Sequence, residues 1–231
     1  MPRLDESLLT HLPPFDGLSR TDIRRILDGA VSRRFEIGAD IFREGEPADR
    51  FFLLLDGYIR VVRTTEAGEQ ITVLHIPAGQ LFGIARAIGR ETYPGRAVAA
   101  AECIVLCWPT ALWDDFTRHY PGFGLSMART VGVRLGEIQS RMQELATLHV
   151  EARIATALLR LITQTGRQTA AGVEIDFPLT RQDLSEMTGT TLHTVSRLLS
   201  AWQREGVVQS QHRRITVLDR ARLEACAQHK G

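Results

Sequence analysis

The sequence predicts an α+β protein with three parts in chain order: an antiparallel β domain of the sandwich, roll or barrel kind, one long helix, and a small C-terminal domain of helices and a hairpin. Three observations support this order. Glycines recur every 7 to 12 residues between short β-branched and aromatic runs from residue 32 to about 109. An apolar heptad pattern follows. The last third contains a helix–glycine–helix spacing with two short strand-like runs after it.

Composition and charge are those of an ordinary globular protein. The 231 residues are 44% hydrophobic and 24% charged, which suits one large domain or two small ones with a buried core. The net charge is +1, but residues 147–231 carry 11 basic and 8 acidic groups, whereas the rest of the chain has a net charge of −2. The C-terminal third is therefore the better candidate for contact with a polyanion.

Cysteine usage and the apolar runs indicate a reduced, cytoplasmic protein. Cys103, Cys107 and Cys226 form neither a disulfide framework nor a zinc-type CxxC pair. Cys103 and Cys107 lie in one strand-like run and should share a face in the core. The N-terminus has no signal-peptide pattern. No apolar run approaches the roughly 20 residues of a membrane helix, so we expect no membrane contact.

The β domain is preceded by a short helix. Residues 19–30 show an apolar face at helical spacing, with Ser19 or Thr21 as the N-cap. The strand-like runs that follow are residues 51–55, 58–62, 70–76 and 97–106. Short runs between regular turns are typical of an antiparallel roll.

The long helix begins near Pro121, because proline is tolerated in a first helical turn. Apolar residues then recur at alternating steps of three and four over about three heptads. Such a narrow seam favours a partner helix, and the simplest partner is a second copy of the chain. In the alternative, the helix packs along its own β domain and also buries Leu125 and Val133. The predicted dimer seam consists of Ala128, Val131, Leu135, Ile138, Met142 and Leu145.

The C-terminal part opens with an amphipathic helix over residues 151–165, a polar loop over 166–172 and a short strand over 173–177. Thr180 then caps a short helix. Gly189 stands where a tight turn between two crossing helices needs a residue without a Cβ. Thr190 or Thr191 caps the second helix.

The second helix carries two opposite stripes, as a DNA recognition helix does. Val195, Leu198, Leu199 and Trp202 form the apolar stripe, and His193, Ser196, Arg197 and Ser200 form the polar one. Arg197 can donate to O6 and N7 of guanine. Any surface helix also has a polar face, but the helix–turn–helix spacing favours double-stranded DNA as the partner. The other candidate DNA-binding residues at the helix starts are Thr180, Arg181 and Thr191.

A hairpin over residues 207–218 completes a winged helix-turn-helix. Its tip carries Arg213 and Arg214, which suit phosphates of the DNA backbone. The predicted domains are a β-roll sensor domain over residues 1–116, a dimerisation helix over 117–148 and a DNA-binding domain over 149–231.

Over nearly its full length the sequence resembles the CRP/FNR family of bacterial transcription regulators. The matching segments are residues 42–48, 54–61, 79–83 and 179–208. The resemblance implies a jelly-roll-type β-roll like that of cyclic-nucleotide-binding domains, a dimerisation helix and a winged helix-turn-helix. It also implies a homodimeric DNA-binding regulator, with RNA polymerase as a further partner.

The competing class is an enzyme, or a β-roll regulatory subunit of one. The sequence shows no nucleophile elbow, no P-loop, no paired catalytic carboxylates and no cupin-like His-x-His spacing. We therefore predict that the chain is not an enzyme.

The resemblance extends unevenly to the family's functional residues. Ser196 and Arg197 match the Glu-x-x-Ser-Arg reading motif, and His193 replaces the Glu. The motif implies an FNR-like half-site with TTG. Ile84 stands where nucleotide-binding members have a Glu after Phe-Gly, which argues against cyclic AMP although Arg96 could hold a phosphate. No iron–sulfur cluster is expected, because a cluster needs four thiolates.

Residues 81–94 together with 192–197 resemble the NnrR branch of the family. That branch implies nitric oxide as the effector and control of denitrification genes, with haem as the sensing cofactor. His11 and His75 are the candidate haem ligands; alternatively, His11 is a surface residue and His75 a packed strand residue. Tyr93 is a further pocket candidate, or an aromatic side chain that packs beside Pro94. Another small ligand or a redox signal is the alternative effector.

Overall fold

The computed structural model describes residues 5–68 and 70–228. Its internal contacts divide the chain into two compact units, each described by itself below. The first unit comprises residues up to 62 together with 74–136, and the second comprises residues 63–73 together with the chain from 137 onward. The predicted domain limits at residues 116 and 148 stay a prediction.

The first unit begins with short helical segments. These are η1 (Glu6–Leu8), η2 (Pro13–Phe15) and the predicted helix, α1 (Arg20–Asp28). Of the two candidate N-caps, the structure uses Ser19, whose hydroxyl accepts a hydrogen bond of 3.1 Å from the Asp22 amide.

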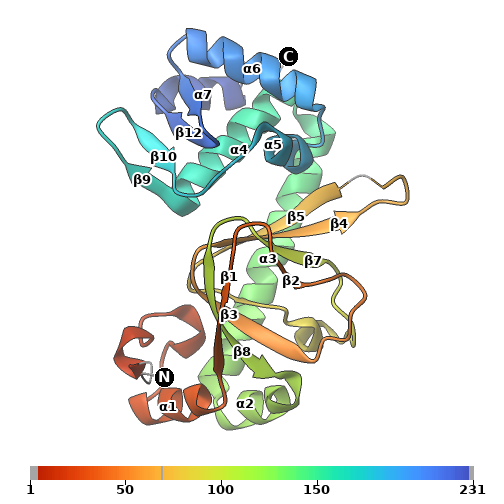
Figure 1. Ribbon diagram of the computed structural model, residues 1–231, viewed down its shortest axis with the longest axis vertical. Helices are drawn as coiled ribbons and strands as arrows, with labels where there is room; N and C mark the ends of the chain where they lie inside the picture. The colour runs from red at the N-terminus through yellow and green to blue at the C-terminus, as the bar shows by residue number, and fades with distance from the viewer. Residues whose placement is uncertain (1–4, 69, 229–231) are drawn as a thin grey trace. The chain divides into compact units, whose positions relative to one another are not determined.

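Two four-stranded sheets form the predicted β-roll (Figure 1). One sheet has the order β1 (Val31–Phe35), β8 (Cys103–Pro109), β3 (Arg50–Asp56) and β6 (Leu81–Phe82). The other has the order β2 (Asp40–Phe42), β7 (Arg96–Ala99), β4 (Tyr58–Thr64) and β5 (Gln70–Pro77). The expectation of one strand over residues 97–106 was wrong, because a bend at residues 100–102 sends β7 and β8 into different sheets.

The interior of the roll is apolar and rich in aromatic rings. Phe42 stacks on Tyr93 with ring centroids 3.8 Å apart, and Phe52 stacks on Phe82 at 5.0 Å. Cys103 and Cys107 are buried in the same cluster, which confirms their predicted place in the core. A short helical turn, η3 (Ala85–Ile88), lies between β6 and β7 in the chain.

The turn between β3 and β4 requires glycine. Gly57 has φ +98°, and a Cβ there would lie 2.2 Å from the Glu102 carbonyl oxygen. Any other residue would displace this turn.

Helices cover the outer face of the first sheet. A second core cluster joins α1, η4 (Thr110–Leu112), α2 (Trp113–His119) and the start of α3 (Pro121–Thr147) to strands β3 and β8. Phe51 stacks on Trp108 at 5.4 Å, and the Trp108 indole donates a 2.7 Å hydrogen bond to the Ile26 carbonyl. The short helix α2 was not predicted, because it spans only seven residues.

Helix α3 begins at Pro121, as predicted, and leaves most of its apolar seam uncovered. The side chains of Leu135, Ile138, Met142 and Leu145 are 55%, 39%, 67% and 53% exposed. Ala128 is exposed as well, whereas Val131 is half-buried against the second core cluster. The alternative of packing along the β domain holds for the start of the helix, where Phe123 and Met127 are buried, but Leu125 and Val133, which it would also bury, are exposed.

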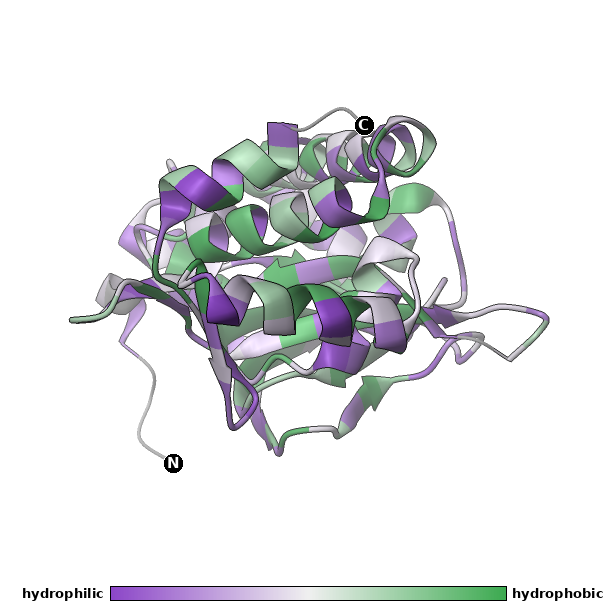
Figure 2. Cartoon of the chain, turned by 90° about the horizontal axis from the view of Figure 1, so that it is seen from above, coloured by the Kyte–Doolittle hydropathy of each residue, from purple (hydrophilic) through white to green (hydrophobic). Residues whose placement is uncertain are grey.

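The second unit is the predicted winged helix-turn-helix. Its helices are α4 (Val150–Thr165), α5 (Arg181–Thr188), α6 (Leu192–Arg204) and α7 (Arg220–Gln228). Its sheet has the order β11 (Val208–Gln211), β12 (Arg214–Val217), β10 (Val173–Ile175) and β9 (Gly166–Gln168). The helices seen in Figure 2 carry both hydrophobic and hydrophilic stretches, as amphipathic helices do.

The expected polar loop over residues 166–172 was wrong in part, because residues 166–168 form strand β9. All three residues are exposed, so they show no alternation that could have predicted a strand. Pairing with β10, in the register Val173 to Gln168, makes these three residues a strand.

Among the described residues, no helix is both long and apolar enough to span a bilayer.

Candidate nucleic-acid interface

Helix α5 starts at a capping box. The Thr180 hydroxyl accepts a hydrogen bond from the Asp183 amide at 3.0 Å, and the Thr180 amide donates to the Asp183 carboxylate at 2.8 Å. Thr180 is therefore engaged in starting the helix, and the exposed Arg181 follows it at the first helical position. Both predicted residues lie at the N-terminal end of α5, where amides and side chains can meet a phosphate.

The turn between α5 and α6 has the predicted left-handed glycine. Gly189 has φ +58° and ends α5. The Ser185 hydroxyl donates a 2.5 Å hydrogen bond to the Thr190 carbonyl, which closes the turn from inside. Of the two candidate caps of α6, the structure uses Thr191, whose hydroxyl accepts from the Thr194 amide at 3.2 Å.

Helix α6 separates its two stripes as predicted. The apolar stripe of Val195, Leu198, Leu199 and Trp202 is buried. On the polar stripe, His193, Arg197 and Ser200 are exposed and Ser196 is half-buried. The structure thus brings the four polar side chains onto one open surface that can meet base edges in a major groove.

Leu192 is a candidate reading residue that the sequence analysis overlooked. It occupies the first position of α6, next to His193, and its side chain is 46% exposed. An apolar side chain at this end of a recognition helix can contact a thymine methyl group. The available signal was an apolar residue directly after the Thr191 cap, at the edge of the apolar stripe and three residues before Val195.

The wing tip adopts a strained two-residue turn. Gln211 pairs with Arg214, so His212 and Arg213 form the loop, with φ +50° and φ +63°. Such turns usually contain Asn-Gly, because side chains with a Cβ resist positive φ. The Arg213 carbonyl accepts a 2.7 Å hydrogen bond from the Leu179 amide, which ties the tip to the segment before α5. Strained residues of this kind concentrate at functional sites.

The two wing arginines are not equivalent. The Arg214 guanidinium lies 2.8 Å from the Glu174 carboxylate, which also pairs with Arg167 at 2.8 Å. The hydrogen bond from Arg167, together with that from Arg214, outweighs the effect of burial and lowers the pKa of Glu174. The Arg214 guanidinium is therefore already paired with a carboxylate, whereas Arg213 is exposed at the tip of the loop.

We expect replacement of Arg213 by Ala to weaken specific and random DNA alike and to reduce the salt slope of binding by about one unit, as for one lost phosphate contact. Replacement of Arg214 by Ala should change the slope less, because its guanidinium is paired with Glu174. Binding isotherms at several salt concentrations measure both slopes. Equal salt slopes for Arg213→Ala and the wild type would show that the wing tip does not contact the DNA.

The effector candidates of the β-roll are already engaged within the protein. Tyr93 is buried and its hydroxyl donates a 2.7 Å hydrogen bond to the Arg50 carbonyl. Burial raises the pKa of Tyr93 to about 12. The Arg96 guanidinium donates to Asp40 at 2.6 Å. Burial opposes ionisation of Asp40, but the hydrogen bonds from Arg43 and Arg96 outweigh it and lower the pKa of this carboxyl.

The two candidate haem ligands lie in different surroundings. His75 on β5 is buried, and its ring stacks on Tyr58 with centroids 5.6 Å apart. His11 is exposed in the N-terminal segment. Among the described residues, no group of three or more His, Cys, Asp or Glu side chains could hold a metal ion.

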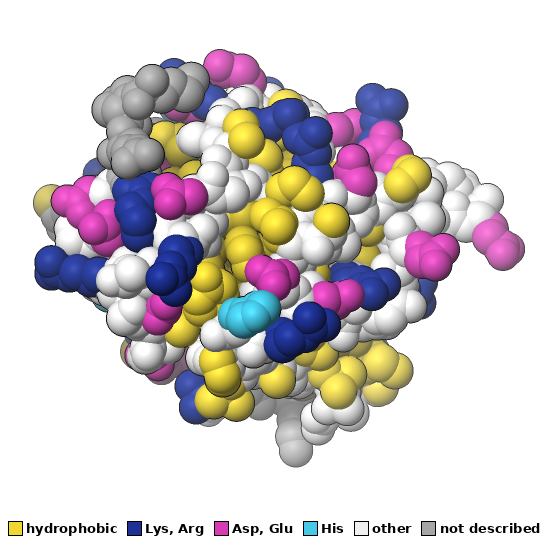
Figure 3. Space-filling view, turned by 90° about the horizontal axis from the view of Figure 1, so that it is seen from below, with side chains coloured by type: hydrophobic (Ala, Val, Ile, Leu, Met, Phe, Trp, Pro, Cys, Tyr) yellow, Lys and Arg dark blue, Asp and Glu magenta, His cyan; other side chains and the backbone are white. Residues whose placement is uncertain are grey.

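The face shown in Figure 3 has acidic and basic side chains interspersed around hydrophobic ones, without a broad field of one charge.

Comparisons with known proteins agree with this architecture. A cyclic nucleotide-binding domain model matches residues 32–120, and a Crp-like helix-turn-helix domain model matches residues 152–226. The global nitrogen regulator of Nostoc sp. is 29% identical over 199 residues, which cover 84% of this chain and 89% of that protein. The transcriptional activator protein Anr of Pseudomonas aeruginosa is 26% identical over 196 residues, which cover 84% and 79%.

A solved structure has a similar fold. The chain is similar to a CRP-family transcriptional regulator from Thermus thermophilus, with a TM-score of 0.74 and 27% identity, over 85% of this chain and 97% of that one. These relatives are regulators rather than enzymes, which supports the prediction that the chain is not an enzyme. The chain contains a β-roll, a long helix and a winged helix-turn-helix, and the two domain models match it in that order. It therefore belongs to the CRP/FNR family of DNA-binding transcription regulators.

Proposed function

We propose that the chain acts as a homodimer that binds a palindromic DNA site with TTG in each half-site. The observation that carries this proposal is the uncovered seam of α3, where four large apolar side chains of one stripe are exposed to solvent. A narrow apolar stripe of this kind suits a second copy of the same helix. A two-fold axis along the seam presents two copies of α6, and a palindrome matches such a pair.

We further propose that the effector of the β-roll is uncharged. Arg96 is paired with Asp40, and Ile84 has no side-chain oxygen that could accept a hydrogen bond from a ribose hydroxyl. A cyclic nucleotide would have to break the ion pair of Arg96 before its phosphate could bind there. A neutral gas such as nitric oxide carries no charge that needs a partner, and it matches the branch resemblance in residues 81–94 and 192–197.

Haem is the proposed sensing cofactor, and it would supply an iron that binds nitric oxide. The packed ring of His75 does not fit a haem ligand while it stacks on Tyr58. His11 is the candidate with an exposed ring. The proposal therefore assigns haem ligation first to His11, and to His75 only in a conformation in which its ring has left Tyr58.

In this proposal, the effector shifts the equilibrium between two arrangements of the dimer because it binds one of them more tightly. Helix α3 belongs to both units and carries the seam, so a shift at the seam reaches the helix-turn-helix. The DNA-bound arrangement then meets RNA polymerase at promoters of nitrogen-oxide or denitrification genes.

Selection of DNA from a randomised pool tests the DNA part of the proposal. The full-length protein should enrich an inverted repeat whose half-sites are about one helical turn apart and contain TTG. Enrichment of a single unrepeated half-site would contradict the homodimer on a palindrome.

An absorption spectrum tests the effector part. Protein reconstituted with haem should show a Soret band that shifts with nitric oxide, and His11→Ala should weaken the band more than His75→Ala does. The absence of a Soret band in the wild type, or a band that neither substitution changes, would contradict the assigned ligands.

A further inference from the structure

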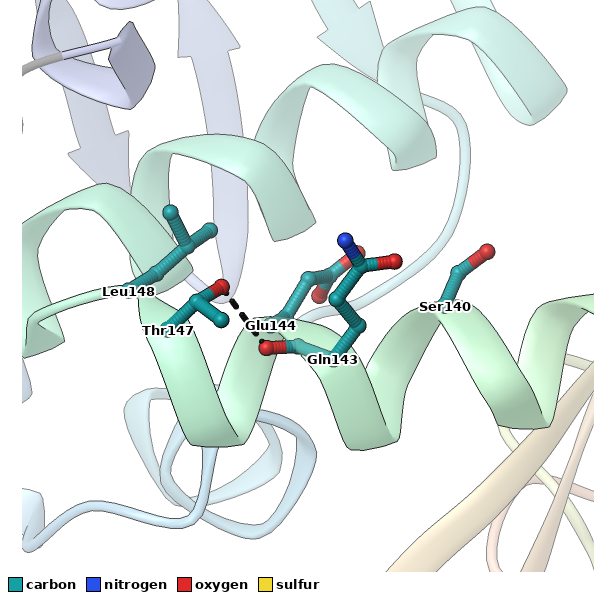
Figure 4. Close-up of a pocket in the computed structure, with 5 residues that line it drawn as sticks. All are labelled: Ser140, Gln143, Glu144, Thr147 and Leu148. Atoms are coloured by element: carbon teal, nitrogen blue, oxygen red, sulfur yellow. Dashed lines mark hydrogen bonds between the residues drawn. The ribbon is translucent and has the colours of Figure 1, made fainter.

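The end of α3 and the start of α4 are joined by only two residues, Leu148 and His149. Within the second unit, Glu144 of α3 pairs with Arg160 of α4 at 2.9 Å. Ser140, Gln143 and Glu144 extend from α3 toward the neighbouring helix (Figure 4), and with Thr147 and Leu148 they line a hollow of about 270 Å³. We call the connection of Leu148 and His149 the hinge. The polar contact between Glu144 and Arg160 beside it would change if either helix moved.

A second arginine connects this hinge to the helix-turn-helix. The Arg153 guanidinium donates a 3.2 Å hydrogen bond to the Leu148 carbonyl and a 3.4 Å hydrogen bond to the Gly189 carbonyl. One carbonyl belongs to the hinge and the other to the turn between α5 and α6. The planar guanidinium holds both at fixed directions, which a flexible ammonium group does not.

Arg153 has no acidic partner in the part of the chain that the structure describes. Its Nε is buried without a hydrogen-bond partner, so the two carbonyls are the contacts of its charged group. Arg153 is half-buried, so its charge loses part of its hydration, and hydrogen bonds from a charged donor, which are stronger than neutral ones, offset that loss. The side chain is thus engaged in joining two backbone segments.

The same turn also touches the dimer seam. A Cβ at Gly189 would lie 3.1 Å from Cδ2 of Leu145, so Leu145 packs against the turn while half of its side chain stays exposed. Gly189 is therefore held by Leu145 of α3 and by Arg153 of α4. Helix α6 starts three residues after Gly189, at the end that carries His193, Ser196 and Arg197.

We propose that Arg153 is a positioning residue for DNA reading: it fixes the helix-turn-helix turn to the hinge of α3 and so sets the place of the N-terminal end of α6. This inference rests on the DNA-binding function of the chain. Hydrogen bonds to bases weaken steeply with misalignment, whereas attraction to phosphates tolerates it. Loss of Arg153 therefore reduces discrimination between DNA sequences more than overall attraction to DNA.

Binding of the full-length protein to its selected palindrome and to a random duplex tests the inference. Arg153→Met keeps an unbranched apolar stem but removes both hydrogen bonds, and it should weaken the palindrome about tenfold with a change below about twofold on random DNA. Arg153→Lys keeps the charge and N–H donors but lacks the planar fork that reaches both carbonyls, so it should recover part of the loss. Arg222→Met is the matched control, because Arg222 bonds to Glu205 on the surface of the same unit.

Three results would overturn the inference while leaving the proposed function intact. Equal weakening of both duplexes with a smaller salt slope would make Arg153 a phosphate contact. A lower melting temperature with unchanged affinity of the folded protein would make it only a structural residue. Equal discrimination by Arg153→Met and Arg222→Met would remove any special role. A wild-type protein that fails to discriminate between the duplexes would contradict the proposed function itself, and the inference with it.

Discussion

Replacement of Arg197 by Ala should cost about 1–3 kcal/mol of binding free energy on the selected palindrome and relax base preference at one position of each half-site. The reason lies in the geometry of α6. Arg197 is exposed next to the half-buried Ser196, on the side opposite the buried stripe. A guanidinium on this surface can donate to two acceptors of one guanine, and alanine offers neither donor. Competition binding against single-base variants of the palindrome measures both effects.

Arg204→Ala is the matched control for this experiment. Arg204 lies on the same helix and is exposed, but it stands at the last helical position and bonds to the Ser200 carbonyl. Its loss removes the same charge far from the N-terminal end of α6. If Arg197→Ala and Arg204→Ala weaken specific and random DNA by the same factor, Arg197 contacts only phosphate.

Replacement of Ile138 by Glu should dissociate the proposed homodimer. Ile138 lies in the middle of the seam and is 39% exposed in the single chain. The two-fold axis would place two new carboxylates together in an apolar interface, where a charge without a partner costs about 3 kcal/mol or more, or about a hundredfold in dimer affinity. Sedimentation equilibrium should then show monomers at concentrations where the wild type is a dimer.

Gln139→Glu is the control for Ile138→Glu, because it adds the same charge at the neighbouring position. Gln139 is exposed and next in sequence, but it lies about 100° further around the helix, at the flank of the seam, where coiled coils commonly carry charged side chains. This variant should stay dimeric and keep its affinity for the palindrome. A dimer that persists with Ile138→Glu would refute the seam, and dissociation by both variants would show that the added charge acts without regard to position.

Local sequence signals predicted much of the winged helix-turn-helix. The cap at Thr180, a cap of α6 at Thr190 or Thr191, the glycine turn at Gly189 and the two stripes of α6 follow from contacts within a few residues, and the structure contains them, with Thr191 as the cap of α6. The start of α3 at Pro121 is a signal of the same kind. These features depend on backbone hydrogen bonding and on helical periodicity, which a short segment carries by itself.

The partners of the charged side chains could not be predicted in this way. Arg214 looked equivalent to Arg213, but the sheet brings Glu174 beside it from 40 residues away. Arg96 looked free for a phosphate until the β-roll placed it against Asp40, 56 residues away. Sequence spacing does not encode such pairs, because strand order and register decide them.

The order of the three parts, the start of the long helix and the polar face of α6 can be predicted from local patterns, because periodicity and capping act over one or two helical turns. The strand β9, the pairing of Arg214 with Glu174 and the bridge from Arg153 to Gly189 arise from the folded chain. Each of these depends on atoms that folding brings together across long stretches of chain, where no local pattern specifies the partner.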